Sequence, residues 1–259
     1  EHKDGAAIVG IHLEGPFISA QFRGAQKEEC ILPPSVETFR RFNAAAGGHI
    51  RLVTVAPEAE GAAQLIEYLK KEGIVASIGH SAATFAQVRE AAALGAGNVT
   101  HTYNAQRPLH HREAGVVGAA LLLDELNCEL ICDTVHVCVP AMRLLAKNKP
   151  RGKLTLVTDA LRAKGACRDG EFYELGGQRF SVKDGQARLP DGTLAGSVLP
   201  MNVAVKNLHE KVGVPLEAAL DCAALNPAKN LGLDGEIGSI AAGKRADFAV
   251  LGEDLSVLA

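Results

Sequence analysis

The chain has 259 residues, of which 47% are hydrophobic and 22% are charged, as is usual for globular proteins. Its formal net charge is −3 and its lysines and arginines are scattered, which argues against a nucleic-acid-binding surface. No apolar run approaches the length of a membrane span, and the first four residues lack the apolar character of a signal peptide.

Six short apolar runs are expected to form strands: residues 6–13, 50–55, 74–78, 97–100, 129–132 and 154–158. Their apolar residues are too continuous for a strand with one buried face, which is typical of a parallel sheet that is covered on both faces. The spacing of apolar residues predicts helices over residues 62–69, 85–95, 141–147 and 201–212. This alternation of strand and helix predicts a parallel barrel or a doubly wound sheet.

Two segments depart from this alternation. Residues 171–193 are rich in Gly and Asp with alternating apolar positions, so we expect a hairpin insertion there, followed by another barrel element at residues 194–197. Residues 238–251 are expected to form a turn and then a short strand outside the barrel.

The six cysteines form no C-x-x-C pair, and several lie in apolar runs. We therefore expect free, buried thiols in a reducing compartment, which predicts a cytoplasmic location. Their spacings do not match a cysteine zinc site.

Polar residues follow five of the predicted strands just past the point where each strand ends: Glu14, His80, His101, His136 and Asp159. In a parallel barrel these ends face one rim, where active sites are built. The pattern therefore predicts that five side chains meet in one small volume.

The chemistry of this set is typical of a metal-dependent hydrolase. Glu14, His80 and His101 offer one carboxylate and two imidazoles, which suit a divalent ion such as zinc and leave a position open for water. Such an ion lowers the pKa of that water and polarises the substrate carbonyl. Asp159 can take the proton of the water and pass it to the leaving amine, and His136 can donate a hydrogen bond to the carbonyl or to a substrate hydroxyl.

Each of these residues also has an ordinary structural explanation. A single histidine is more often a satisfied polar group than a ligand, residues 14–16 can form a turn, and Asp159 can cap a helix. His12 can orient a ligand from behind. The loop at residues 107–113 carries two arginines, which can bind a phosphate or make weak surface ion pairs. Five coincidences at five strand ends favour a shared site.

Several sequence strings closely resemble those of N-acetylglucosamine-6-phosphate deacetylases, in the same order and spacing. They are residues 12–17 (HLEGPF), 55–58, 79–81, 100–105 (THTYNA), 110–113, 157–160, 194–197 and 226–228. The segment 243–247 is similar to a tail that many amidohydrolases share. The resemblance extends from about residue 10 to the end of the chain.

This resemblance implies a TIM-type (β/α)8 barrel of the amidohydrolase kind, with Glu14, His80 and His101 as metal ligands and Asp159 as the catalytic aspartate. The implied ion is zinc, with iron or another divalent ion as alternatives. The implied reaction, in amino-sugar catabolism, hydrolyses N-acetylglucosamine 6-phosphate to glucosamine 6-phosphate and acetate. Two alternatives stay open: the same reaction on N-acetylgalactosamine 6-phosphate, and a catalytically silent fragment that binds a sugar phosphate.

The resemblance also assigns substrate contacts to His136, Gln26, Asn104, the backbone of Ala105, and Arg112. His136 matches a residue near the acetyl group and the sugar, whereas Asn104 and Ala105 match contacts on the phosphate side. Arg112 matches an arginine that reaches the phosphate in the neighbouring subunit, which implies a homodimer. The partner is thus a small sugar phosphate, with no nucleic acid and no membrane.

Members of the resembled family usually begin with a small β-sandwich segment and a first barrel strand that ends in a His-x-His pair. Neither feature occurs here. We therefore expect a barrel without its first strand over residues 1–232 and part of a small β-sandwich over residues 233–259. Thr134 stands where glycine is common in the family.

Overall fold

A computed structural model describes residues 6–165 and 170–258. Its centre is a curled sheet of six parallel strands that lie side by side in chain order. The strands are β1 (Ile11–Glu14), β2 (Ile50–Val55), β3 (Val75–Ile78), β4 (Ala96–Val99), β5 (Asn127–Ile131) and β6 (Leu154–Val157). Because neighbouring strands are parallel, all six carboxyl ends open on one side of the sheet. The predicted parallel sheet is confirmed.

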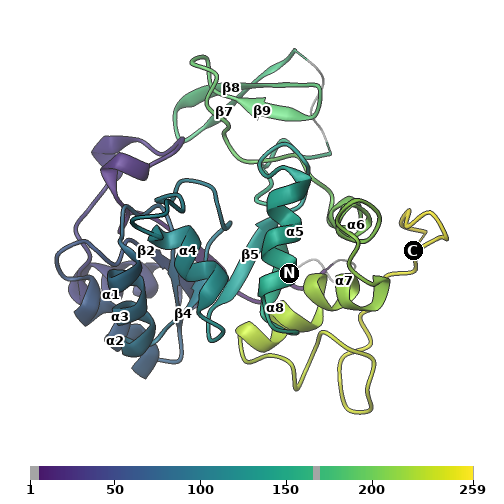
Figure 1. The fold of residues 1–259 in the computed structure, drawn as a ribbon, viewed down its shortest axis with the longest axis horizontal. Helices are drawn as coiled ribbons and strands as arrows, with labels where there is room; N and C mark the ends of the chain where they lie inside the picture. Colours follow the sequence, from purple (N-terminus) through teal and green to yellow (C-terminus); the bar gives the residue numbers. More distant parts are fainter. Residues whose placement is uncertain (1–5, 166–169, 259) are drawn as a thin grey trace.

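Helices connect successive strands and lie around the outside of the sheet (Figure 1). Those between the strands are α1 (Val36–Ala45), α2 (Ala62–Lys71), α3 (Phe85–Leu94), α4 (Gly115–Leu122) and α5 (Val139–Asn148). After β6 come α6 (Met201–Lys206), the π-helix η3 (Asn207–Val212), α7 (Leu216–Ala223) and α8 (Leu225–Asn230). Two short 3-10 helices, η1 (Ala20–Phe22) and η2 (Glu28–Cys30), follow β1. Within the described ranges, no helix is long and apolar enough to cross a lipid bilayer.

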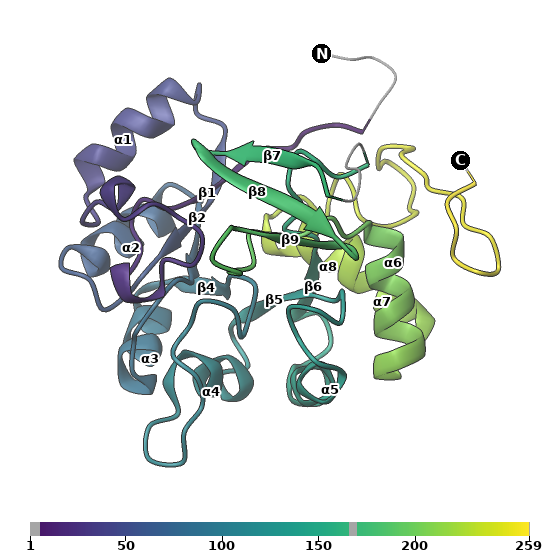
Figure 2. The same cartoon turned by 90° about the horizontal axis from the view of Figure 1, so that it is seen from above.

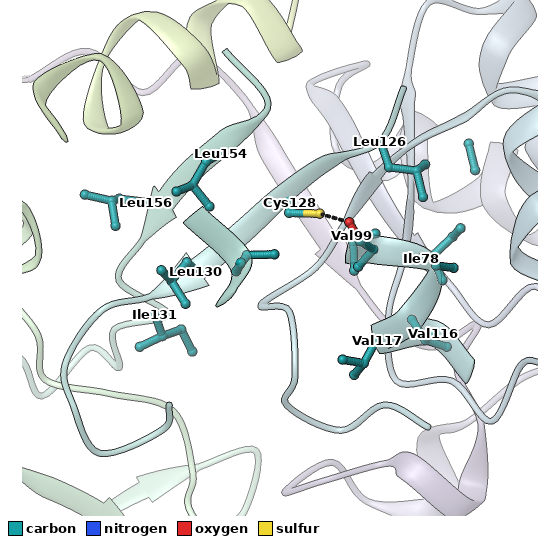
Figure 3. Packing of buried hydrophobic residues seen from close by; sticks show 14 of the residues in the cluster. Ile78, Val99, Val116, Val117, Leu126, Cys128, Leu130, Ile131, Leu154 and Leu156 are labelled. Carbon is teal, nitrogen blue, oxygen red and sulfur yellow. Dashed lines mark hydrogen bonds between the residues drawn. The ribbon is translucent and has the colours of Figure 1, made fainter. Parts of the chain in front are cut away.

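The main core lies between the sheet and these helices. Ile78, Val99 and Leu130 belong to three successive strands and pack in the same cluster as Val116 and Val117 of α4 (Figure 3). All five are at least 95% buried, so this cluster removes a large apolar area from water and holds the strand ends in a fixed relation.

The predicted insertion is confirmed, with three strands rather than the two of a hairpin. Three antiparallel strands, β7 (Phe172–Leu175), β8 (Gln178–Lys183) and β9 (Gln186–Arg188), form a separate small sheet. This sheet lies beside the carboxyl ends of the parallel strands (Figure 2). Phe180 and Val182 pack beneath it with Ala163 and Ala195, which gives it a small core of its own.

Three expectations about local structure are corrected by the structure. The first strand covers Ile11–Glu14 rather than residues 6–13, and residues 6–9 are exposed because no described strand pairs with them. Residues 194–197 form single bridges instead of a strand, from Ser197 to Ala160 and from Leu194 to Arg188. The expected strand near residue 250 is absent from the described chain, where Leu251 forms one bridge with Val257.

The cysteine prediction holds in part. Cys30, Cys128, Cys132, Cys138 and Cys222 are all free, as expected. However, Cys30 and Cys138 are exposed, because they lie at a 3-10 helix and at a helix N-cap on the rim of the sheet, outside its core. Cys167 lies outside the described residues.

Candidate active site

Three of the predicted site residues share an unusual backbone conformation just after a strand. His80, His101 and Asp159 each lie two residues beyond the last residue of β3, β4 and β6. Each has a positive φ, of 47°, 26° and 48° respectively, although none is a glycine. Such conformations cost free energy in residues with a side chain and persist where the surroundings hold them, often at functional sites. The shared turn brings the three side chains to the same cavity from three strands.

Glu14, His80 and His101 form a tight cluster at the ends of β1, β3 and β4. Oε1 of Glu14 lies 2.6 Å from Nε2 of His80 and 2.8 Å from Nε2 of His101. The two Nε2 atoms are 3.1 Å apart. Two imidazole nitrogens and a carboxylate oxygen at such distances need a positive charge among them, which a proton or a metal ion can supply.

The hydrogen bonds behind the cluster favour a metal ligand role. Nδ1 of His80 lies 2.8 Å from the carbonyl oxygen of Phe22. That contact places a proton on Nδ1 and leaves Nε2 of a neutral ring with a free lone pair. The three potential ligand atoms lie within 4.8 Å of one another, and their chemistry fits a divalent cation of the zinc type.

The electrostatics of the cluster set up a competition between a proton and a metal ion. Burial raises the pKa of Glu14, but its contacts with the rings of His101 and His80 outweigh this effect and hold that pKa well below its usual range. Burial lowers the pKa of His101, yet its bond to Glu14 outweighs this effect and raises the pKa to about 9. The cluster therefore retains a positive charge near neutral pH, and a metal ion has to displace a proton to bind there.

The pKa of Asp159 is shifted in the opposite direction to that of Glu14. Its burial is the main cause of a raised pKa, and the nearby charge of Glu14 adds to it, against the influence of His101, His136 and His80. A carboxyl with a raised pKa next to a cluster that can hold a metal ion is suited to taking up and returning a proton.

His136 is held by Asp133, which lies three residues earlier in the loop after β5. Oδ2 of Asp133 is 2.6 Å from Nδ1 of His136, and Oδ1 accepts the backbone N–H groups of Val135 and His136 at 2.8 Å each. Burial raises the pKa of Asp133, but these bonds from His136 and Val135 lower it overall. The contact fixes the ring and leaves Nε2 for a ligand in the cavity.

The cavity has a volume of about 830 Å³ and brings most of the predicted site together. Its lining includes Glu14, His80, His101, His136, Asp159, Gln26, Asn104 and Ala105. Arg112 does not line it: this residue lies in an exposed loop with Nη1 2.7 Å from Nε2 of His111. The insertion closes one side, where Nε2 of Gln178 donates to the carbonyl oxygen of Ala25 over 2.7 Å.

Two supporting carboxylates were not assigned a role from the sequence. Asp133 holds His136, and Glu58 holds the turn after His80 by accepting Oγ of Ser81 at 2.7 Å and the N–H of Ala82 at 2.5 Å. Glu58 lies in the string 55–58, but nothing in that string shows which distant turn it contacts. His12 bonds Thr54 at 2.8 Å and none of the three cluster residues.

The chain matches the model of the amidohydrolase family over residues 1–258 and belongs to that family. It is 44% identical to an N-acetylglucosamine-6-phosphate deacetylase of Bacillus subtilis (strain 168), over 98% of this chain and 64% of the relative. It is 40% identical to an N-acetylgalactosamine-6-phosphate deacetylase of Escherichia coli O157:H7, over 98% of this chain and 66% of the relative.

A solved structure is also similar. A mutant of the N-acetyl-D-glucosamine-6-phosphate deacetylase of Mycobacterium smegmatis, in complex with N-acetyl-D-glucosamine-6-phosphate, superposes with a TM-score of 0.91 at 38% identity. The match covers 96% of this chain and 65% of that one. The chain thus spans a little under two thirds of the length of the curated relatives that it matches.

Proposed function

We propose that the protein is a metal-dependent deacetylase that hydrolyses N-acetylglucosamine 6-phosphate to glucosamine 6-phosphate and acetate. The observation that carries this proposal is the Glu14–His80–His101 cluster, in one cavity with Asp159 and His136. The 44% identity to a deacetylase of this name supports the choice of substrate.

In this proposal Glu14, His80 and His101 hold one divalent ion, zinc in the first instance. When bound, the ion would supply an activated water and polarise the acetamide carbonyl. Asp159 takes the proton of the attacking water and then donates it to the leaving amine, so that the proton is conserved over the reaction. His136, held by Asp133 through Nδ1, offers its other nitrogen to the substrate.

The same proposal covers the architecture around the site. The six parallel strands form part of a (β/α)8 barrel of the amidohydrolase kind, with residues 1–232 in the barrel and residues 233–259 in a small β-sandwich. Gln26, Asn104 and the backbone of Ala105, which line the cavity, contact the sugar phosphate. A cytoplasmic location stays a prediction.

The test combines metal analysis of the purified protein with an assay of acetate release from N-acetylglucosamine 6-phosphate. We expect one bound divalent ion per chain and metal-dependent acetate release. Bound sugar phosphate without metal and without acetate would overturn the proposal and favour a silent binding protein.

The galacto epimer is the second candidate substrate, because a relative named for it is 40% identical to this chain. The two sugars differ in one hydroxyl, so the contacts of a few side chains decide between them. A competition assay with both sugar phosphates gives the ratio of kcat/KM directly. A ratio that favours the galacto sugar would change the proposed substrate and leave the chemistry intact.

We further propose a homodimer in which Arg112 binds the phosphate in the partner's site, since Arg112 lies outside the cavity of its own chain. R112A and D159N should each be nearly inactive alone. Mixed dimers would contain one site with both groups intact, so co-refolding the two variants should restore part of the activity. Absence of restoration in a verified mixed dimer would rule out the shared site.

A further inference from the structure

A network of buried polar side chains lies inside the sheet and reaches the backbone of His101 in the Glu14–His80–His101 cluster. It runs from Thr54 through Thr100, Ser77 and Asn98 to Glu129, with bonds of 2.6–2.9 Å between successive members. Every member is at least 95% buried. The interior of a parallel barrel is usually filled by branched apolar side chains, so this polar core requires an explanation.

Glu129 is the carboxylate of this network. It lies on β5 and is 5% exposed, and no ion pair with Lys or Arg is found for it within residues 6–165 and 170–258. Its Oε1 accepts Nδ2 of Asn98 at 2.9 Å, and its Oε2 accepts the backbone N–H of His101 at 3.2 Å. A carboxylate buried without a Lys or Arg partner carries a desolvation cost that its hydrogen-bond partners have to offset.

The backbone of Glu129 also holds Thr102, the residue that follows His101. The N–H of Thr102 donates to the carbonyl oxygen of Glu129 over 2.8 Å. Two consecutive N–H groups, those of His101 and Thr102, are therefore anchored to one residue. His101 lies at φ 26°, a sparsely populated conformation that persists only where contacts of this kind hold it.

We propose that Glu129 is a positioning residue for the metal site. It holds the strained turn at His101 so that Nε2 faces Glu14 and His80, and its negative charge favours a cation in the cluster. This inference rests on the proposed metal site and goes beyond it, since Glu129 touches neither the cluster atoms nor the cavity. Residues of this kind behind a ligand typically change metal affinity 10–100-fold, by order of magnitude.

The test compares E129Q with T155V as a matched control. Gln keeps the size of Glu and an acceptor for His101, but it removes the charge. Thr155 lies opposite Glu129 on β6, is equally buried, and bonds Asn127 rather than any ligand. We expect the dissociation constant of Zn²⁺, measured by chelator competition, to rise about tenfold or more in E129Q and to stay within about twofold in T155V.

A second variant guards against a failure of E129Q to fold. E129D keeps the charge and withdraws the carboxylate by one methylene from the N–H of His101. We expect weaker Zn²⁺ binding than in the wild type, with an altered visible spectrum of the Co²⁺ form. Wild-type affinity and spectrum in E129D or E129Q would overturn the positioning role, as would an equal loss of affinity in T155V.

These outcomes are separable from the fate of the proposed reaction. If the wild type binds Zn²⁺ but releases no acetate, the reaction fails, whereas the comparison of metal affinities still decides the role of Glu129. If the wild type binds no Zn²⁺, both the metal site and the role of Glu129 are overturned.

Discussion

At the residue scale, the carboxyl of Asp159 shares its cavity with Glu14 and the cluster histidines, and burial raises its pKa. Replacing it with Asn removes the proton acceptor with almost no change in size. We expect D159N to lower the kcat of acetate release by about 10³-fold while one metal ion per chain is retained. The exposed Asp124 provides the matched control, and D124N should keep wild-type kcat. Substantial turnover in D159N would contradict the proposed role of Asp159 in proton transfer.

Asp133 gives a second residue-scale prediction, which concerns pH. Its pKa in the folded protein lies below the unfolded value of about 3.9, so the unfolded chain takes up the proton first as the pH falls. The ionised Asp133 therefore stabilises the fold above about pH 4, and this contribution is lost as the pH falls through the folded-state pKa. We expect D133N to lower the free energy of unfolding by about 1 kcal/mol at pH 7, allowing for solvent screening.

The measurement for Asp133 is urea denaturation of the wild type and D133N at several pH values between 7 and 3. The difference between the two proteins should narrow on acidification. A difference that stays constant over this range would mean that the charge of Asp133 contributes nothing and that only its shape matters.

At the scale of elements, the strands of the sheet were predictable because parallel strands buried on both faces are largely apolar along their length. The run at residues 50–55 matches β2 at both ends. Helix α4 was not predicted, since its sequence is apolar on every face and every residue from Gly115 to Leu121 is buried. A helix without a polar face has no stripe to reveal it.

The candidate site, too, was predictable in part. The rule that strand ends share one rim was enough to bring five residues of the sequence to one cavity. It was not enough to find the bonds from Glu58, because a hydrogen bond between a side chain and a distant turn leaves no local pattern. Asp133 bonds residues only two and three positions ahead, so the spacing of Asp133 and His136 was a local signal that could have predicted this contact. The positive φ of His80, His101 and Asp159 was equally hidden, since the surroundings and not the residue type hold that conformation.

The β7–β9 sheet leads to a prediction about substrate binding. It is tied to the loop after β1 by the bond from Gln178 to Ala25, next to the predicted substrate residue Gln26. Q178A removes one neutral hydrogen bond, which is worth about 1 kcal/mol. We expect KM for the sugar phosphate to rise about fivefold, with kcat and metal content nearly unchanged. The exposed Arg179 lies on the same strand, and R179A should leave KM unaltered.

At the scale of the whole molecule, the cluster joins parts of the chain that are far apart. Glu14 is 66 residues from His80 and 87 residues from His101, so its ligand atoms meet only in the folded protein. A metal ion held there binds the folded state and not the unfolded one, and its binding free energy adds to the stability. At a free metal concentration about 1,000 times the dissociation constant, the gain is about 4 kcal/mol.

Removing the metal should therefore lower the thermal stability of the entire chain. For a protein of this size we expect the unfolding temperature to fall by roughly 8 °C when a chelator is added, and to recover with excess Zn²⁺. Differential scanning calorimetry measures this shift. E14A should abolish the response because it removes the shared carboxylate, whereas the exposed His49 offers a control, and H49A should respond like the wild type. If a chelator lowered the unfolding temperature of E14A by the same amount, the stabilising ion would have to bind elsewhere. The Glu14–His80–His101 cluster would then not be its site.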